Sequence, residues 1–210
     1  MPLFYQHNIN ETTRLAVWKI EESEDFFAFN VPFHREINHP HKRLQHLAGR
    51  YMLQHLFPDF PYELMVIADT RKPYLSNEAY HFSISHCNDY AAAIVSSTHR
   101  VGVDIELVKP QISAIRTKFL SEEEWTKIRR GFQGMEEELM LTMAWSSKEA
   151  MYKWYGYGGV DFKKHMILKE ILSTGKGWSD STYLFAKEKE VVLDLHARIF
   201  GNLVLAFVMT

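Results

Sequence analysis

One pattern occurs twice along this chain, and it restricts the possible folds more than any other feature. Long amphipathic helices are predicted over residues 38–57 and 136–155, from apolar residues at the 3.6-residue period. Each helix is later followed by a tight hairpin, over 81–96 and 195–209. The repetition predicts an α+β fold with a pseudo-twofold duplication, in which a small antiparallel sheet packs on a long helix in each half.

The same repetition predicts the domain organisation. We expect an N-terminal α+β half over residues 1–106 and a C-terminal α+β half over 107–210. The groove between two such halves is the natural place for a ligand. The alternative is that one helix-and-hairpin match arises by chance in an ordinary α+β protein.

Composition excludes several classes of partner. The formal net charge is −2 over 210 residues, so overall charge does not attract nucleic acid. The longest apolar runs have the length of strands, and the N-terminus lacks the pattern of a signal peptide. The single cysteine, Cys87, excludes an internal disulfide and fits a reducing compartment. We therefore expect a cytoplasmic protein without a membrane or nucleic-acid partner.

The strand predicted over 101–106 carries two carboxylates on one side. Side chains alternate along a strand, so Gly102, Asp104 and Glu106 share the face opposite its apolar residues. The two carboxylates then lie about 7 Å apart, beside a glycine that would let a bulky anion approach. Such oxygen ligands suit Mg²⁺ bound together with a substrate phosphate. The alternative is an ordinary half-exposed strand with a polar outer face.

Two further groups of charged residues lie on the predicted helices. Glu149 and Lys153 are one turn apart, where they could hold a metal and a phosphate, or form a plain surface ion pair. Arg43, His46 and Arg50 share one stripe of the first helix, which suits a phosphate or is a solvated basic face. Lys72 and His86 are further candidate phosphate donors.

The order of these segments resembles the two-half, monomeric, surfactin-type 4′-phosphopantetheinyl transferases. The resemblance extends from about residue 43 to residue 156. The segments that carry it are Ala48-Gly49-Arg50, Lys72-Pro73, Phe82 to His86, Gly102 to Glu106, Phe119 to Trp125, and Trp145 to Lys153.

The resemblance implies a role for each matching residue. Asp104, Glu106 and Glu149 are implied as ligands of Mg²⁺. Lys153 and Lys72 are implied as contacts of the coenzyme A pyrophosphate, and Arg50 as the residue that holds the 3′-phosphate. Ser85, His86 and Arg43 are implied as further contacts of coenzyme A.

The implied reaction is a magnesium-dependent transfer of 4′-phosphopantetheine to a serine of an apo acyl or peptidyl carrier protein. This holo-acyl-carrier-protein synthase activity releases 3′,5′-ADP, and charge neutralisation matters most for such a transfer. Glu149 and Lys153 are the implied catalytic residues, with Glu149 as the first choice for the base and Lys148 as the alternative. A coenzyme A-binding module without turnover and a metal-dependent phosphodiesterase are the competing hypotheses.

Two positions depart from the family pattern, and one agrees with it for a local reason. Cys87 stands where serine or threonine is frequent, and Arg71 where glycine is frequent. Glu124 occupies a family-typical glutamate position, but the spacing from Ser121 predicts that it caps a helix.

Overall fold

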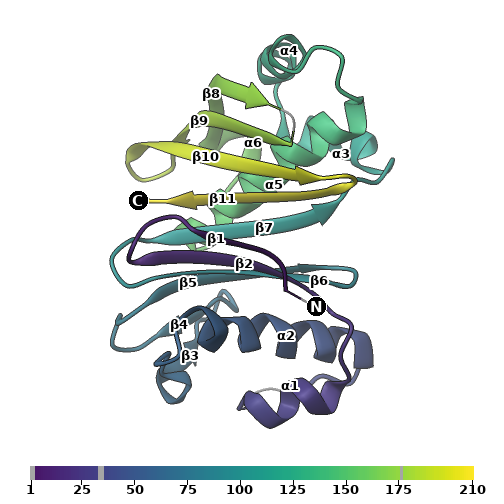
Figure 1. Cartoon of the computed structure of the whole chain (residues 1–210). Helices are drawn as coiled ribbons and strands as arrows, with labels where there is room; N and C mark the ends of the chain where they lie inside the picture. The colour runs from purple at the N-terminus through teal and green to yellow at the C-terminus, as the bar shows by residue number, and fades with distance from the viewer. Residues whose placement is uncertain (1–2, 33–35, 176) are drawn as a thin grey trace.

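The molecule is layered, with helices outside and two large antiparallel sheets between them, and it has a third sheet of only two strands (Figure 1). The computed structural model describes residues 3–32, 36–175 and 177–210. In chain order the elements are β1 (Leu3–Asn8), β2 (Thr13–Lys19), α1 (Glu24–Asn30), α2 (Pro40–Leu56), η1 (Tyr62–Leu64), β3 (Met65–Ile67), β4 (Pro73–Leu75), β5 (His81–Cys87), β6 (Tyr90–Ser96), β7 (Val101–Leu107), α3 (Ile112–Phe119), α4 (Glu122–Gly131), α5 (Glu137–Tyr155), α6 (Phe162–His165), β8 (Met166–Gly175), β9 (Trp178–Ala186), β10 (Glu190–Phe200) and β11 (Leu203–Met209).

Both sheets repeat one connectivity. The first sheet has the order β1-β2-β6-β5 and the second the order β7-β11-β10-β9-β8. In each, a strand that precedes the long helix (β2 or β7) pairs with the last strand (β6 or β11), which pairs with the strand before it (β5 or β10). The predicted α+β fold is therefore confirmed, with the long helices α2 and α5 each packed on an antiparallel sheet.

The position of β7 corrects where the second half begins. β7 pairs with β11 along its whole length, from Val101 opposite Met209 to Leu107 opposite Leu203. By sheet membership the second half starts at Val101, and the expected boundary between residues 106 and 107 falls inside its first strand. The sequence pattern placed β7 with the hairpin before it because the two are adjacent in the chain, whereas pairing joins β7 to the C-terminus.

Local signals explain where the helices of the second half begin and end. At the start of α4, the Ser121 hydroxyl accepts a hydrogen bond from Glu124 N (3.1 Å), and Glu124 Oε2 accepts one from Ser121 N (2.9 Å). This capping box confirms the predicted helix start. The second long helix ends as predicted at Gly156, whose φ of 79° is the left-handed conformation that favours glycine.

Three apolar cores hold the layers together. One lies between α2 and the first sheet, and another lies between the second sheet and α3, α4 and α5. The third joins the two sheets face to face, with Leu15 and Ile94 from the first sheet against Val103, Ile105 and Leu205 from the second. All five side chains have 0% exposure, so the two halves share a core that either half alone would leave open to water.

A line of side-chain hydrogen bonds, which we call the seam, joins β5 to β7. Val103 N donates to Ser83 Oγ (3.1 Å), and Ile105 N donates to Ser85 Oγ (3.3 Å). Leu107 N donates to the Cys87 sulfur (3.3 Å). Alternate residues of one edge strand thus satisfy alternate amides of the other, and a thiol can serve where the family often has a hydroxyl.

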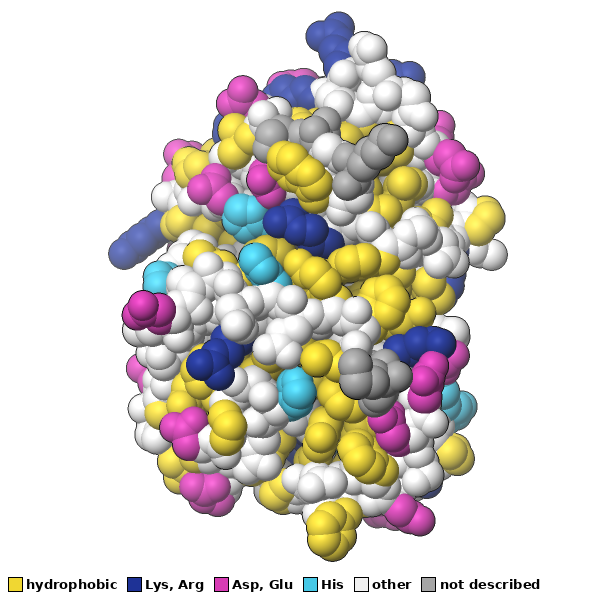
Figure 2. Space-filling model, in the orientation of Figure 1, with side chains coloured by type: hydrophobic (Ala, Val, Ile, Leu, Met, Phe, Trp, Pro, Cys, Tyr) yellow, Lys and Arg dark blue, Asp and Glu magenta, His cyan; other side chains and the backbone are white. Residues whose placement is uncertain are grey.

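Apolar side chains also reach the surface across the middle of the molecule (Figure 2). Phe4 of β1 contacts the rings of Tyr90 and Phe200, each at 5.3 Å between centroids. β1 therefore helps to close the junction of the two sheets. Within the described ranges, no helix combines the length and the apolar character that a membrane span requires.

Candidate active site

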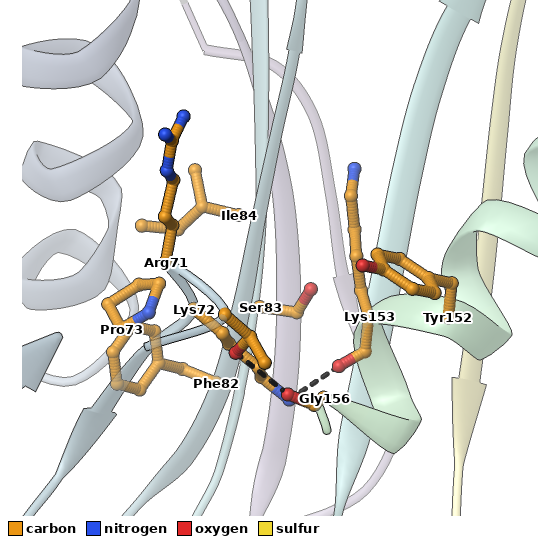
Figure 3. A pocket seen from close by; sticks show the side chains of 10 residues that line it. Arg71, Lys72, Pro73, Phe82, Ser83, Ile84, Tyr152, Lys153 and Gly156 are labelled. Atoms are coloured by element: carbon orange, nitrogen blue, oxygen red, sulfur yellow. Dashed lines mark hydrogen bonds between the residues drawn. The ribbon is translucent and has the colours of Figure 1, made fainter. Parts of the chain in front are cut away.

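A cavity opens in the groove between the halves, beside the seam (Figure 3). Its volume is about 200 Å³, and its walls come from the turn before β4, from β5 and from the end of α5. A second hollow of about 540 Å³ continues past Lys72 and Gly156, which line both. Figure 3 shows Lys153 and Tyr152 facing Arg71 and Ile84 across the first cavity.

Asp104 is the acceptor shared by the polar groups beside this cavity. We call Asp104, with Ser85 and Lys153 bonded to it, the hub. It is 2% exposed, and its Oδ1 accepts hydrogen bonds from Lys153 Nζ (2.6 Å) and Ser85 Oγ (2.9 Å). Lys153 Nζ also donates to Ser85 Oγ (2.7 Å). The other oxygen, Oδ2, is buried and has no hydrogen-bond partner in the described part of the chain. The hub thus leaves one strong acceptor unsatisfied.

Two more carboxylates, those of Glu106 and Glu149, lie close enough to Asp104 to be repelled by its charge. Burial, followed by repulsion from Asp104, raises the pKa of Glu149 to about 7. The same two causes raise the pKa of Glu106 above its usual range. The three carboxylates are neighbours, yet among the described residues no three acidic, histidine or cysteine side chains form a ready metal cage.

Lys72 reaches the same groove from the other half. Its ammonium donates to the main-chain carbonyl of Lys153, at the end of α5. Burial, with a smaller contribution from Arg100, lowers the pKa of Lys72 to about 8. Within the described chain its side chain forms no ion pair with a carboxylate, so this lysine is a cation available to an anionic ligand.

Arg50 is a buried cation rather than part of a solvated basic face. It is 2% exposed on α2, and its Nη1 has no hydrogen-bond partner among the described residues. Burial lowers the pKa of its guanidinium. Such a buried charge is costly unless something pairs with it, which suits an anionic ligand.

The structure does not place Arg43 with Arg50. The Arg43 guanidinium makes a bidentate ion pair with Glu24 of α1 (2.6 and 2.9 Å) and donates to the carbonyl of Ile37 (2.8 Å). Its expected contact with coenzyme A has no support in this geometry, because three of its five N–H donors hold the guanidinium against Glu24 and Ile37. Glu24 was missed because α1 has only one buried residue, Phe27, and carries no clear period.

Of the two β5 residues, Ser85 faces the hub, whereas His86 does not. Ser85 is 5% exposed and bonded to Asp104. His86 is exposed, as expected for the next residue along a strand, although it lies within electrostatic reach of Lys153 and Asp104.

Lys148 is structural, which removes it as a candidate base. It is 0% exposed, and its ammonium donates to Glu124 Oε1 (2.7 Å), to the Phe119 carbonyl (2.7 Å) and to the Phe162 carbonyl (3.0 Å). Three donors meet three acceptors, so none remains for a substrate. Glu124 does more than cap its helix, because this pair ties α3, α4 and α6 to α5.

Two glycines serve packing rather than ligand access. A Cβ on Gly102 would lie 2.1 Å from the Ala150 carbonyl oxygen, because α5 rests directly on β7 there. A Cβ on Gly49 would lie 2.5 Å from a methyl group of Ile84, so this glycine also allows close packing. The expected opening for an anion beside Gly102 is therefore wrong.

The departure at Arg71 also has a backbone reason. Arg71 has a φ of 66°, in the left-handed region that glycine adopts without strain. This explains why glycine suits the position before Lys72. Arg71 accepts the strain and adds a cationic side chain to the cavity wall (Figure 3).

Fold and site together define a class of protein, namely two packed α+β units whose groove sets carboxylates against lysines. The model of the 4′-phosphopantetheinyl transferase superfamily matches residues 100–207, and the chain belongs to this family. The matched segment includes Asp104, Glu106, Glu149 and Lys153, whereas Arg50 and Lys72 lie outside it.

Curated relatives agree with this assignment. The chain is 33% identical to enterobactin synthase component D of Salmonella austin over 112 residues, covering 53% of this chain and 47% of the relative. It is 31% identical to the protein of that name from Escherichia coli (strain K12) over 130 residues, 59% of this chain and 60% of the relative. It is 30% identical to 4′-phosphopantetheinyl transferase psf-1 of Bacillus pumilus over 119 residues, 53% and 50%. The chain thus spans about half the length of the curated relatives it matches.

Proposed function

We propose that this protein transfers 4′-phosphopantetheine from coenzyme A to a serine of an apo acyl or peptidyl carrier protein, with release of 3′,5′-ADP. The observation that carries the proposal is the hub at Asp104, where carboxylates and Lys153 meet above a cavity between the halves. Family membership supports the same reaction. We also propose that the protein acts as a monomer, since one chain supplies both walls of the groove. Action in the cytoplasm is a further part of the proposal.

Mg²⁺ is the metal that the family implies. The chemistry of the residues fits it, although the three side chains would have to converge further to hold the ion. Asp104 Oδ2 is a buried acceptor that lacks a donor within the described chain, and Asp104 disfavours the charged forms of Glu106 and Glu149. A divalent cation would relieve both conditions. Asp104, Glu106 and Glu149 would hold the ion, whose charge would help to neutralise the pyrophosphate.

Three cations would bind coenzyme A. Lys72 and Lys153, from opposite halves, would contact the pyrophosphate. Arg50, buried and without a partner for Nη1 among the described residues, would hold the 3′-phosphate. Ser85 keeps Lys153 oriented through its hydroxyl (2.7 Å), and His86 lies within electrostatic reach of Lys153.

Glu149 is the proposed base for the serine hydroxyl. Without a metal, burial and Asp104 raise its pKa to about 7. A bound divalent cation would lower this pKa, so Glu149 would be ionised and able to accept the serine proton. Lys153 would stabilise the charge that moves onto the leaving phosphate as the bond breaks.

The test is to incubate the protein with coenzyme A, Mg²⁺ and an apo carrier protein, and to weigh the carrier by mass spectrometry. The expected result is a mass increase equal to one phosphopantetheine group. A carrier whose acceptor serine is replaced by alanine is the control, and its mass should not change.

The same assay separates the competing functions. Cleavage of coenzyme A without a carrier would indicate a phosphodiesterase, and binding without cleavage would indicate a module that lacks turnover. Asp104→Asn, which keeps the shape of the side chain and removes its charge, should lose transfer while retaining its far-ultraviolet circular dichroism. Full transfer by this variant would contradict the assigned role of the hub.

A further inference from the structure

The ammonium of Lys153 stands where a cation bound to Asp104 would stand. It lies 2.6 Å from Asp104 Oδ1 and 2.7 Å from Ser85 Oγ. Ser85 Oγ in turn donates to Asp104 Oδ1 and accepts from Ile105 N. One side of Asp104 is therefore saturated by protein groups, whereas Oδ2 has no partner in the described chain.

The charges around Asp104 do not balance with Lys153 alone. When ionised, Asp104, Glu106 and Glu149 carry three negative charges, and Lys153 returns one, which leaves −2. Among the described residues, no ion pair to Glu106 or Glu149 accompanies the Lys153–Asp104 pair. A divalent cation in the place of Lys153 would supply +2, which reduces the net negative charge of the cluster from −2 to −1 and leaves Lys153 to pair with a different anion.

The ammonium of Lys153 can move away from Asp104 while the backbone of Lys153 stays fixed in α5. Its Cα belongs to α5, and its carbonyl accepts a hydrogen bond from Lys72. Its side chain is 26% exposed, whereas that of Asp104 is 3% exposed. In Figure 3 the Lys153 stem extends along the cavity wall with its nitrogen at the end far from Gly156. Rotation of a flexible four-carbon stem can thus move the ammonium without moving the helix.

We propose that Lys153 is a resident counter-cation of Asp104, and that a divalent metal ion displaces it. The displaced ammonium is then free to bind the phosphates of the substrate. The binding of the displaced ammonium to substrate phosphates rests on the proposed function, whereas the exchange of Lys153 for a metal ion at Asp104 does not. Metal binding and the Lys153–Asp104 ion pair therefore compete, and a protein without Lys153 binds the metal more tightly.

The experiment measures Mn²⁺ binding in the absence of coenzyme A, from the electron paramagnetic resonance signal of free Mn²⁺. Lys153→Met keeps the length of the side chain and removes the competing charge. We expect it to bind Mn²⁺ roughly tenfold more tightly than the wild-type protein, from the size of a charged hydrogen bond. Lys153→Arg keeps the charge and should keep the weaker binding. Ser85→Ala, which removes one acceptor of the ammonium, should tighten binding in the same direction.

Lys72→Met is the matched control, because it removes one positive charge from the same groove without vacating Asp104. It should change Mn²⁺ affinity much less than Lys153→Met does. In an Asp104→Asn background, Lys153→Met should no longer tighten binding. Equal or weaker Mn²⁺ binding by Lys153→Met, or equal tightening by Lys72→Met, would overturn the exchange. Carrier loading by the wild-type protein, measured separately, would still decide the proposed function.

Discussion

Arg50 is a residue whose effects on stability and on binding should have opposite signs. Its buried guanidinium has one nitrogen without a partner in the described chain, so it costs folding free energy while the ligand is absent. Arg50→Met, of similar length and without charge, should raise the free energy of unfolding in urea. The same variant should raise KM for coenzyme A, with a loss of about 1.5–3 kcal/mol from a charged hydrogen bond.

The 3′-phosphate provides the control for Arg50. Dephospho-coenzyme A lacks this group, so wild-type protein should prefer coenzyme A, and Arg50→Met should discriminate poorly between the two. The contact is remote from the bond that breaks, so kcat should change little. An unchanged preference for coenzyme A in the variant would show that Arg50 does not hold this phosphate.

The lowered pKa of Lys72 predicts that the protein takes up a proton when coenzyme A binds. Its pKa is lowered from 10.5 to about 8, so part of the free protein carries a neutral Lys72 above that pH. A bound phosphate favours the charged form and raises the pKa again, so Lys72 takes up a proton on binding at about pH 8–9 and none at about pH 6.5, where it is already charged. Calorimetry of coenzyme A binding in two buffers with different ionisation enthalpies measures this uptake. Lys72→Met should remove it, and an uptake that persists in this variant would come from another group.

Single residues also show what the sequence could predict about the site. The strand alternation indicated that Asp104 faces away from the apolar residues of its strand, and helix spacing placed Glu149 and Lys153 one turn apart. The structure brings Lys153 into contact with Asp104. The partners were not predictable, because Glu24 meets Arg43 and Glu124 meets Lys148 across long sequence separations. Nothing in the spacing around Lys148 distinguishes a buried structural lysine from a catalytic one.

At the scale of elements, the contact of α5 with β7 sets the geometry of the site. Gly102→Ala would place a methyl group against the backbone of α5, 2.1 Å from the Ala150 carbonyl oxygen and 2.7 Å from Trp154 N. The helix must then shift, which moves Glu149 and Lys153 away from Asp104. We expect a stability loss of at least about 1–3 kcal/mol in urea unfolding, together with a loss of carrier loading.

Gly49→Ala is the comparison for this variant. Its new methyl group would meet a side-chain methyl of Ile84 at 2.5 Å, and a side chain can rotate where a backbone cannot. Its cost should therefore be smaller. If both variants lost the same stability, the approach of α5 to Gly102 would not be the rigid contact described.

The helices and strands with a clear hydrophobic period or a clear capping signal were the ones that the sequence predicted. The long helices, the capping box before α4 and the hairpin strands β5, β6 and β11 follow strong local signals. α1 and α3 were not predicted, because they are short and each buries only one side chain, Phe27 and Phe119. β7 was recognised as a strand, but its partner β11 lies at the other end of the chain.

For the whole molecule, the core shared by the two sheets predicts a single unfolding transition. Leu205→Ala removes a side chain with 0% exposure from this core and should cost about 2–5 kcal/mol. Because both halves bury surface there, heat or urea should still unfold them together, and the calorimetric and van't Hoff enthalpies should agree. Separate transitions reported by Trp18 in the first half and by the tryptophans of the second would contradict this coupling.

The seam between β5 and β7 makes one strand a reporter of two separate interfaces. The amides of Val103, Ile105 and Leu107 are bonded to side chains of β5. Because N–H groups alternate along a strand, those of Gly102, Asp104 and Glu106 face β11. Deuterium uptake at the first set therefore follows the parting of the two halves, and uptake at the second follows fraying within one sheet. A ligand that clamps the groove would slow exchange at every other residue of β7.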